Sequence, residues 1–321
     1  MINKFQKLCV PGVAGLSPYQ PGKPLSELER EYGISNAVKI ASNENPVGVS
    51  NKVTQFLKDN IHDLCRYPDG NGFDLKTALA RFYNVDFEQL TLGNGSNDTL
   101  ELIARAFVAV GDEVIFSEHA FAVYPLITQA IGATAVVTKA TNWGYNLDNI
   151  VKAVTDKTKI IFIANPNNPT GTWITENDLS EFLNVVPDHV IVVLDEAYFE
   201  YASHPEMAIK NYPDGLRWLS KYPNLIVTRT FSKAYALAGL RVGYSVSHPD
   251  LANILNRIRQ PFNVNSMALL AAEVALTDTE HLEQTIKLNV AGMKYIVSEL
   301  NKMKIDSIPS AGNFISISLG N

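Results

Sequence analysis

Cysteine is scarce in this sequence, with Cys9 and Cys65 as the two thiols among 321 residues. Two thiols cannot build a disulfide framework, so we expect a reduced protein of the cytoplasm. Long apolar runs are also missing. The first twelve residues do not resemble a signal peptide, and no stretch reaches the length of a membrane helix. The six histidines are scattered without metal-ligand spacing, so we expect neither a metal site nor a membrane partner.

Positive charge is in the minority. The chain has 27 basic and 33 acidic residues, a net charge of −6, and no basic run. This balance argues against a nucleic-acid partner. With 46% hydrophobic and 19% charged residues, the chain has ample material for a core. Its length predicts one large and one smaller domain, or two of similar size.

Short apolar, β-branched runs recur in the first three quarters of the chain and predict strands. They read TLGNG, which ends a short strand, then EVIFS, TAVVT, KIIFIA, VIVVLDE and LIVTRT. These runs lack alternation, which is typical of strands buried on both faces in a mostly parallel sheet. We therefore predict an α/β fold: a three-layer α/β/α large domain with a mostly parallel sheet, and a smaller α+β domain.

Amphipathic segments predict the helices. The expected helices cover residues 24–32, 96–110, 121–131, 147–154, 175–186, 249–258, 266–276 and 280–303, with two more whose apolar stripes are Val53, Phe56, Leu57, Ile61 and Leu75, Leu79, Phe82. Thr175 followed by Asp178 resembles a helix cap. A strand pair is expected at 305–308 and 314–317. We expect an N-terminal arm over residues 1–45, a large domain over 46–247 and a small domain over 248–321.

The segment RTFSKAYALAGLRVGY, residues 229–244, contains one lysine among apolar neighbours. An apolar environment lowers the pKa of a lysine and leaves a nucleophilic amine, which can form a Schiff base with an aldehyde. Arg241 and the hydroxyls of Thr230 and Ser232 could bind an anionic group on the same molecule. The alternative is a surface lysine, Lys233, whose stem lies along apolar side chains.

Two polar turns follow predicted strands, where open α/β sheets bind their ligands. GNGSND, residues 93–98, precedes a helix, so its backbone N–H groups could bind a phosphate, although an ordinary turn with a helix cap would read the same. It lacks the third glycine of a dinucleotide fingerprint. NPNNPTG, residues 165–171, can continue neither helix nor strand. This stiff loop is suited to aiming a side-chain amide.

Two further groups follow strands. Asp195 comes directly after the apolar run IVVL, where a carboxylate is costly unless it is paired. It could pair with a pyridinium nitrogen, or it could simply cap a helix. The rings of HAFAVY, residues 119–124, could stack on a flat cofactor or pack in the core. Together these groups suit one planar, phosphorylated aldehyde that contains nitrogen.

The segments PYQPGKP, ASNENP, RYPDG, GNGSND, NPNNPTG, LDEAYFEY and RTFSKAYALAGLRVGY resemble those of the fold-type I pyridoxal-phosphate aminotransferases. They extend from Tyr19 to Tyr244. Within this class the chain is most similar to the histidinol-phosphate aminotransferase family.

The resemblance implies a role for each matching residue. Lys233 would be the catalytic lysine that binds the cofactor aldehyde and carries the proton. Asp195 would contact the ring nitrogen, Asn168 and Tyr198 the phenolic oxygen, and Phe121 the ring face. The phosphate would be held by Gly95, Ser96, Asn97, Thr230, Ser232 and Arg241. Tyr19 and Asn43 would lie near the substrate.

The resemblance also implies a homodimer with two shared sites, in which Tyr67 reaches the phosphate of the other subunit. At least one of the Asn165–Pro166 and Asn168–Pro169 bonds should be cis. The implied reaction is ping-pong: glutamate leaves as 2-oxoglutarate, and the nitrogen then passes to imidazole-acetol phosphate to give histidinol phosphate.

Three other functions stay open. A decarboxylase acting on threonine phosphate would use the same residues, and so would an aminotransferase for phenylalanine or tyrosine. An effector-sensing domain of a transcription regulator is a third alternative. It would need a DNA-binding segment, and residues 1–45 have neither the length nor the basic charge for one.

The sequence departs from the family pattern in two places. Asn97–Asp98 stands where relatives usually have Asp–Glu, and we expect no loss of phosphate binding. Relatives also continue beyond the position of Asn321 into a strand with an arginine for the acidic group of the substrate, whereas no arginine follows Arg259 here. We expect that the natural protein has such a tail, because a domain ending within a sheet would expose an uncovered edge.

Overall fold

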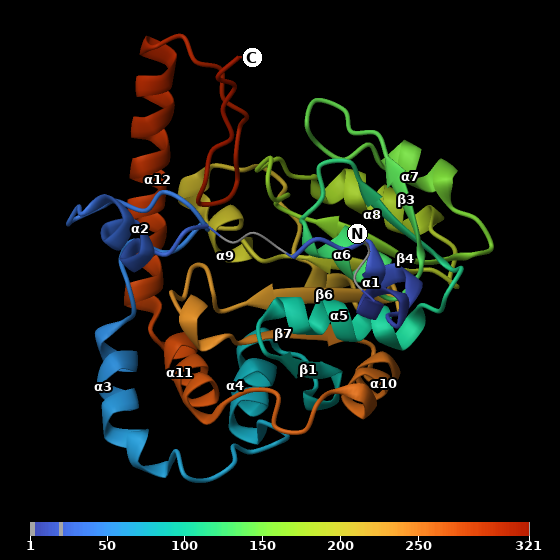
Figure 1. Ribbon diagram of the computed structural model, residues 1–321, viewed down its shortest axis with the longest axis horizontal. Helices are drawn as coiled ribbons and strands as arrows, with labels where there is room; N and C mark the ends of the chain where they lie inside the picture. The colour runs from blue at the N-terminus through green and yellow to red at the C-terminus, as the bar shows by residue number, and fades with distance from the viewer. Residues whose placement is uncertain (1–3, 19–21, 321) are drawn as a thin grey trace.

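The computed structural model describes residues 4–18 and 22–320. Tyr19, which the sequence placed near the substrate, lies outside these residues. The centre of the molecule is a seven-stranded sheet covered by helices on both faces, and the long helix α12 (Thr279–Lys302) stands to one side of it (Figure 1). In the described part of the chain, no helix is both long and apolar enough to cross a membrane.

The sheet has the spatial order β1-β7-β6-β5-β4-β2-β3. Its strands are β1 (Leu90–Gly93), β2 (Glu113–Ser117), β3 (Thr134–Thr138), β4 (Thr158–Ala164), β5 (Ile191–Asp195), β6 (Leu225–Thr230) and β7 (Gly243–Ser247). The five strands from β3 to β6 are parallel, which confirms the predicted sheet. β7 was not predicted. It pairs antiparallel with both β1 and β6 and so joins the first strand to the others.

Besides α12, the structure contains α1 (Pro11–Ala14), α2 (Leu25–Tyr32), α3 (Asn51–Asn60), α4 (Phe73–Tyr83), α5 (Ser96–Phe107), α6 (Val123–Ala130), α7 (Leu147–Ala153), α8 (Glu176–Val185), α9 (Phe199–Ala202), α10 (Pro249–Ile258) and α11 (Ser266–Thr277). The Thr175 hydroxyl accepts a hydrogen bond from the backbone N–H of Asp178 and starts α8, as predicted. Phe82 departs from the prediction. Its side chain is 48% exposed, whereas Leu75 and Leu79 are buried.

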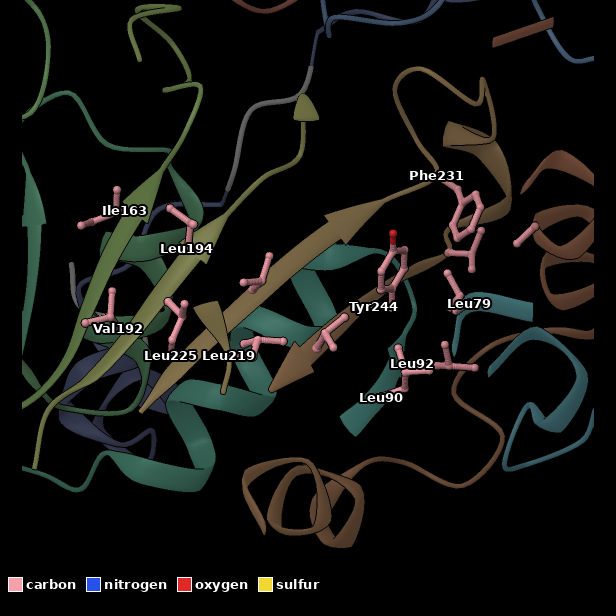
Figure 2. Close-up of a cluster of buried hydrophobic side chains, with 14 of the residues drawn as sticks. Leu79, Leu90, Leu92, Ile163, Val192, Leu194, Leu219, Leu225, Phe231 and Tyr244 are labelled. Carbon is pink, nitrogen blue, oxygen red and sulfur yellow. The ribbon is translucent and has the colours of Figure 1, made fainter. Parts of the chain in front are cut away.

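Successive residues along the central strands point to opposite faces of the sheet and pack into two different hydrophobic cores. The sheet and the helices on its two faces form the three layers. On β4, Ile160 and Phe162 pack with α5, α6 and α10 on one face. Ile161 and Ile163 pack into the opposite core, which includes residues of α4, α8 and α11. Figure 2 shows part of this second core, where the rings of Phe231 and Tyr244 lie near Leu79 and Leu92. Both faces of the sheet are therefore buried, as the apolar runs predicted.

Helices distant in sequence meet beside the sheet. α11 packs on α3 and α4 (Figure 1). The Lys52 ammonium at the start of α3 lies 2.7 Å from a carboxylate oxygen of Asp278, between α11 and α12. The boundaries of the arm and of the two expected domains stay predictions.

The two segments predicted to pair near the end of the described chain do pair antiparallel, but over one bridge and without forming full strands. A single antiparallel bridge joins Ser307 to Ile317, with a backbone hydrogen bond from Ile308 N–H to Ser316 O at 2.9 Å. Pro309 lacks an N–H group, and Ala311 donates its own to Gly171 O at 2.9 Å instead. On the other side of the bridge, Ser318 N–H donates to Asp306 O at 3.1 Å. Pro309 and Ala311 therefore end the pairing in one direction.

Arg229, on β6, is fully buried. It donates to Glu196 from Nε at 2.9 Å and from Nη2 at 2.6 Å, and to Asp214 at 2.7 Å. Its guanidinium carbon lies 3.5 Å from the centre of the Phe199 ring. Removing one member of a buried ion pair leaves the other charge uncompensated, which costs more than the pair itself contributes.

We therefore expect Arg229→Met to lower the free energy of unfolding by about 3–5 kcal/mol, measured by urea unfolding of the cofactor-free protein. Arg217→Met is the control. Arg217 is 78% exposed and lies 3.6 Å from the same Asp214, so this change should stay within about 0.5 kcal/mol. Adding Glu196→Gln to Arg229→Met should recover part of the loss. An equal loss in the single and double variants would contradict this explanation.

Candidate active site

The chemistry-bearing side chains gather where the parallel strands end. Asp195 is the last residue of β5 and is 4% exposed. Tyr124 donates its hydroxyl hydrogen bond to Oδ2 of this carboxylate at 2.9 Å, and Thr228 donates to Oδ1 at 3.1 Å. Burial raises the pKa of Asp195, while the two hydroxyls and the charge of Lys233 act in the opposite direction. A cation beside this carboxylate would compensate for its burial.

Lys233 lies in the loop after β6, and its ammonium reaches the N-terminal arm. Nζ donates to the backbone carbonyls of Ser42 at 3.2 Å and of Asn43 at 3.5 Å. Burial, followed by the charge of Arg241, lowers the pKa of Lys233 to about 8. A much larger fraction of this amine is therefore unprotonated near neutral pH than in an ordinary lysine, which is what a nucleophile requires.

Tyr198 lies between the lysine and the stiff loop. Its ring centre is 5.6 Å from Lys233 Nζ, and its hydroxyl accepts from the Nδ2 groups of Asn43 at 3.0 Å and Asn168 at 3.2 Å. Asn168 belongs to the NPNNPTG loop, in which both Asn–Pro bonds are cis. This confirms the expectation of at least one cis bond. Burial raises the pKa of Tyr198, so its hydroxyl keeps its proton.

A second group of side chains is suited to binding an anion. Arg241 Nη1 donates to Ser232 Oγ at 3.3 Å, and Thr230 Oγ1 donates to the same oxygen at 3.0 Å. Gly95 precedes α5, and no side chain in the described ranges caps that helix start. The backbone N–H groups at the start of this turn are therefore suited to binding an anion, whereas that of Asp98 donates to Gly95 O at 3.1 Å.

Two glycines allow these elements to approach closely. Gly95 has φ +80°, and a Cβ there would lie 2.4 Å from Nη2 of Arg241. A Cβ on Gly243, at the start of β7, would lie 2.4 Å from the backbone nitrogen of Ser96. Any side chain at either position would push the arginine or the helix start away. The site therefore depends on the close contact of β7 with the turn after β1.

Three further residues predicted for the site are Phe121, Asn97 and Tyr67. Phe121 is half-buried, and its ring meets that of Tyr124 edge-on at 5.8 Å between centres. Asn97 is exposed in the first turn of α5. Tyr67 is 82% exposed and stacks on Phe262 at 4.8 Å, outside the group of side chains around Lys233.

The structure also contains a cleft of about 1270 Å³. Its lining includes His119, Trp143 and Thr170, but neither Lys233 nor Asp195. The cleft and the group of reactive side chains are therefore different places in the molecule. The residues predicted to carry the chemistry belong to the second.

A family model described as aminotransferase class I and II matches residues 35–321. The chain belongs to this aminotransferase family. Relatives named histidinol-phosphate aminotransferase are similar to it over nearly its whole length. One from Idiomarina loihiensis is 55% identical over 314 residues, covering 98% of this chain and 84% of the relative. One from Pseudomonas fluorescens is 56% identical over 322 residues, covering 100% and 86%.

Solved structures agree with this assignment. The crystal structure of histidinol-phosphate aminotransferase from Sinorhizobium meliloti, in complex with pyridoxal-5'-phosphate, has a TM-score of 0.88 and 28% identity, covering 98% of this chain and 83% of that one. Aspartate aminotransferase from Thermus thermophilus, at 19% identity and a TM-score of 0.75, shows the same fold.

Several residues of the candidate site were missed in the sequence. Tyr124 was considered only as a stacking or core ring, yet its position one helical turn after Phe121 could have suggested a second role. Thr228 pairs in register with Asp195, which only the order of the strands reveals. Asn313 donates from Nδ2 to Asn43 O at 3.0 Å, and nothing in its local sequence indicates this contact.

Proposed function

We propose that this aminotransferase uses pyridoxal 5'-phosphate to exchange an amino group between histidinol phosphate and 2-oxoglutarate, forming imidazole-acetol phosphate and glutamate. In the biosynthetic direction it would make histidinol phosphate on the route to histidine. The observation that carries the proposal is the convergence of Lys233, Asp195 and the anion-binding group of Ser232 and Arg241. The names of relatives at 51–56% identity support the choice of substrate.

The residues present fit this cofactor. Arg241, Thr230, Ser232 and the start of α5 would hold the phosphate, and the shape of this anion site depends on the absence of a Cβ at Gly95. The buried carboxylate of Asp195 would meet the protonated ring nitrogen. Asn168 and Tyr198 would contact the phenolic oxygen, with Phe121 on the ring.

When bound, pyridoxal phosphate supplies an aldehyde for the amine and a ring that delocalises negative charge from the reacting carbon. Lys233 supplies the attacking amine and then moves a proton at Nζ from one carbon of the substrate to the other. The carboxylate of Asp195 would stabilise a proton on the ring nitrogen. Tyr198 and Asn168 would donate hydrogen bonds to the phenolic oxygen.

The lowered pKa of Lys233 predicts how the cofactor-free protein takes up pyridoxal phosphate. The rate should rise about tenfold per pH unit below pH 8 and level off above it, because only the neutral amine attacks. An ordinary lysine would keep rising to pH 10 or above. The measurement is the absorbance of bound cofactor after rapid mixing at a series of pH values. A rate still rising through pH 10 would contradict a buried amine.

We also propose that the enzyme is a homodimer of the cytoplasm with two shared active sites, where Tyr67 contacts the phosphate of the partner. Ile61, Leu64 and Tyr67 expose 52%, 54% and 82% of their surface. Such a cluster of exposed apolar side chains is typical of a protein interface. Neither Cys9 nor Cys65 is in a disulfide bond, which suits a reducing compartment.

Mixing two inactive variants tests the shared sites. Lys233→Ala and Tyr67→Ala, denatured together and refolded, should form mixed dimers in which one site carries both changes and the other neither. About a quarter of all sites would then be intact, because about half of the dimers are mixed. Each variant refolded alone is the control. No recovery of activity in the mixture would argue that each site is built from one chain.

The substrate is tested with purified, cofactor-loaded protein. Histidinol phosphate should change the visible spectrum of the bound cofactor, and 2-oxoglutarate should restore it with formation of glutamate. Competition between histidinol phosphate and phenylalanine distinguishes the proposed enzyme from an aromatic aminotransferase. Release of carbon dioxide would indicate a decarboxylase. A spectrum that responds to phenylalanine but not to histidinol phosphate would overturn the proposed substrate while leaving the cofactor in place.

A further inference from the structure

The hydroxyl of Tyr198 has an unusual set of partners. Two side-chain amides donate to it, Nδ2 of Asn43 at 3.0 Å and Nδ2 of Asn168 at 3.2 Å. A hydroxyl oxygen that accepts twice has only its own proton left for a further hydrogen bond. With both asparagines donating to its oxygen, the Tyr198 hydroxyl can form a further hydrogen bond only by donating its proton to an acceptor.

Only one of these asparagines belongs to the cofactor-binding loop. Asn43 comes from the N-terminal arm, where Ser42 and Asn43 have φ +70° and +51°. The carbonyls of this turn accept hydrogen bonds from Lys233 Nζ at 3.2 and 3.5 Å. One short turn therefore contacts both the reactive amine and the phenol beside it.

The turn is held from two directions. Asn313 donates from Nδ2 to the carbonyls of Asn43 at 3.0 Å and Glu44 at 3.3 Å. Asn45 donates to Ala234 O at 3.0 Å and to Thr285 Oγ1 at 3.2 Å. The left-handed conformation at Asn43 suits asparagine better than most residues. These contacts fix the position of the Asn43 amide relative to Tyr198.

We propose that Asn43 is a positioning residue that directs the Tyr198 hydroxyl proton toward the phenolic oxygen of the cofactor. The proposal rests on the proposed pyridoxal-phosphate chemistry, and it gives the arm a role in cofactor electronics besides any contact with substrate. With Asn43 in place, Tyr198 donates to the cofactor. Without it, the phenol regains a free lone pair and can rotate toward other partners.

The measurement is a pH titration of the visible absorbance of the cofactor bound to Lys233. Its midpoint is the pH at which half of the absorbance change has occurred. A hydrogen bond to the phenolic oxygen stabilises its negative charge and so lowers this midpoint. Tyr198→Phe should raise it by about one pH unit, and Asn43→Gly by about half a unit. Glycine is used because it keeps the positive φ without strain. The charged groups that influence Lys233 are Arg241, Glu44 and Asp195, and all three are unchanged.

The double variant decides between positioning and a general loosening of the arm. If Asn43 acts through Tyr198, adding Asn43→Gly to Tyr198→Phe should produce no further shift. Asn36→Gly is the matched control, because Asn36 is an exposed arm residue with φ +65°, and it should leave the midpoint unchanged. An additive shift in the double variant, or no shift in Asn43→Gly, would overturn the proposal. If the wild type shows no visible band with pyridoxal phosphate, the proposed function itself has failed.

Discussion

Replacing Lys233 with alanine is expected to lower the rate of transamination by on the order of 10⁶-fold, the scale seen when an essential covalent group is removed. The variant loses both the attacking amine and the group that carries the proton between the two carbons. Pyridoxal phosphate should still bind through the anion site, but without the visible band of the bound cofactor. The measurement combines single-turnover kinetics with the absorption spectrum.

A matched control for this variant is Lys76→Met. Burial also lowers the pKa of Lys76 to about 8, and its side chain is 3% exposed. Its ammonium lies 5.1 Å from the centre of the Phe87 ring, away from the reactive group. A lowered pKa alone does not make a catalytic lysine, so this change should leave turnover within a few-fold. A transamination rate near that of the wild type in Lys233→Ala would contradict the assignment of Lys233 as the catalytic lysine.

The second large effect is expected for Asp195→Asn. An isosteric amide keeps the shape of the site but removes the charge that holds the ring nitrogen protonated. We expect kcat to fall by about 10²–10³-fold, as for the loss of one preorganised electrostatic group in a water-excluded site. Stability of the cofactor-free protein should not fall, because burial already raises the pKa of this carboxyl and disfavours its charged form.

Glu200→Gln is the control for this change. Glu200, on α9, is also a buried acid, and burial raises its pKa to about 7. It has no place in the proposed chemistry, so the amide should leave kcat unchanged within a few-fold. Equal losses in the two variants would mean that the effect of Asp195 is structural. Unfolding by urea, measured in parallel, separates a damaged fold from a damaged site.

The parallel part of the sheet could be predicted because its strands are short apolar runs buried on both faces. β7 could not, since GYSVS is no continuous apolar run: Gly243, Ser245 and Ser247 alternate with Tyr244 and Val246, after a turn in which Arg241 has φ +55°. Its place in the sheet comes from pairing with β1 and β6, which are far apart in the sequence. The strand pair predicted near the end is reduced to one bridge, because Pro309 lacks an N–H group and Ala311 donates its own to Gly171.

In the site, too, residues with a telling local sequence could be predicted, whereas residues that act through contacts between distant segments could not. Lys233, Asp195 and Asn168 could be proposed because each is a polar residue in a local context that one shared ligand would explain, although a surface lysine and a helix cap were open alternatives for the first two. Tyr124 and Thr228 act on Asp195 from two other elements, so only the assembled sheet reveals them. Asn43 was assigned to the substrate, whereas the structure places its amide on the Tyr198 hydroxyl. Its contact with Lys233 uses a backbone carbonyl, which residue type does not predict.

The position of β7 between β1 and β6 has a consequence for folding. Parallel neighbours such as β4 and β5 can pair early, but β1 must wait until a strand made much later in synthesis arrives beside it. Closing so long a loop is entropically costly and makes this pairing slow. The turn that would bind the phosphate meets Arg241 only after that step. A nascent chain should therefore acquire affinity for its cofactor late, and the cofactor can stabilise only chains whose sheet is already complete.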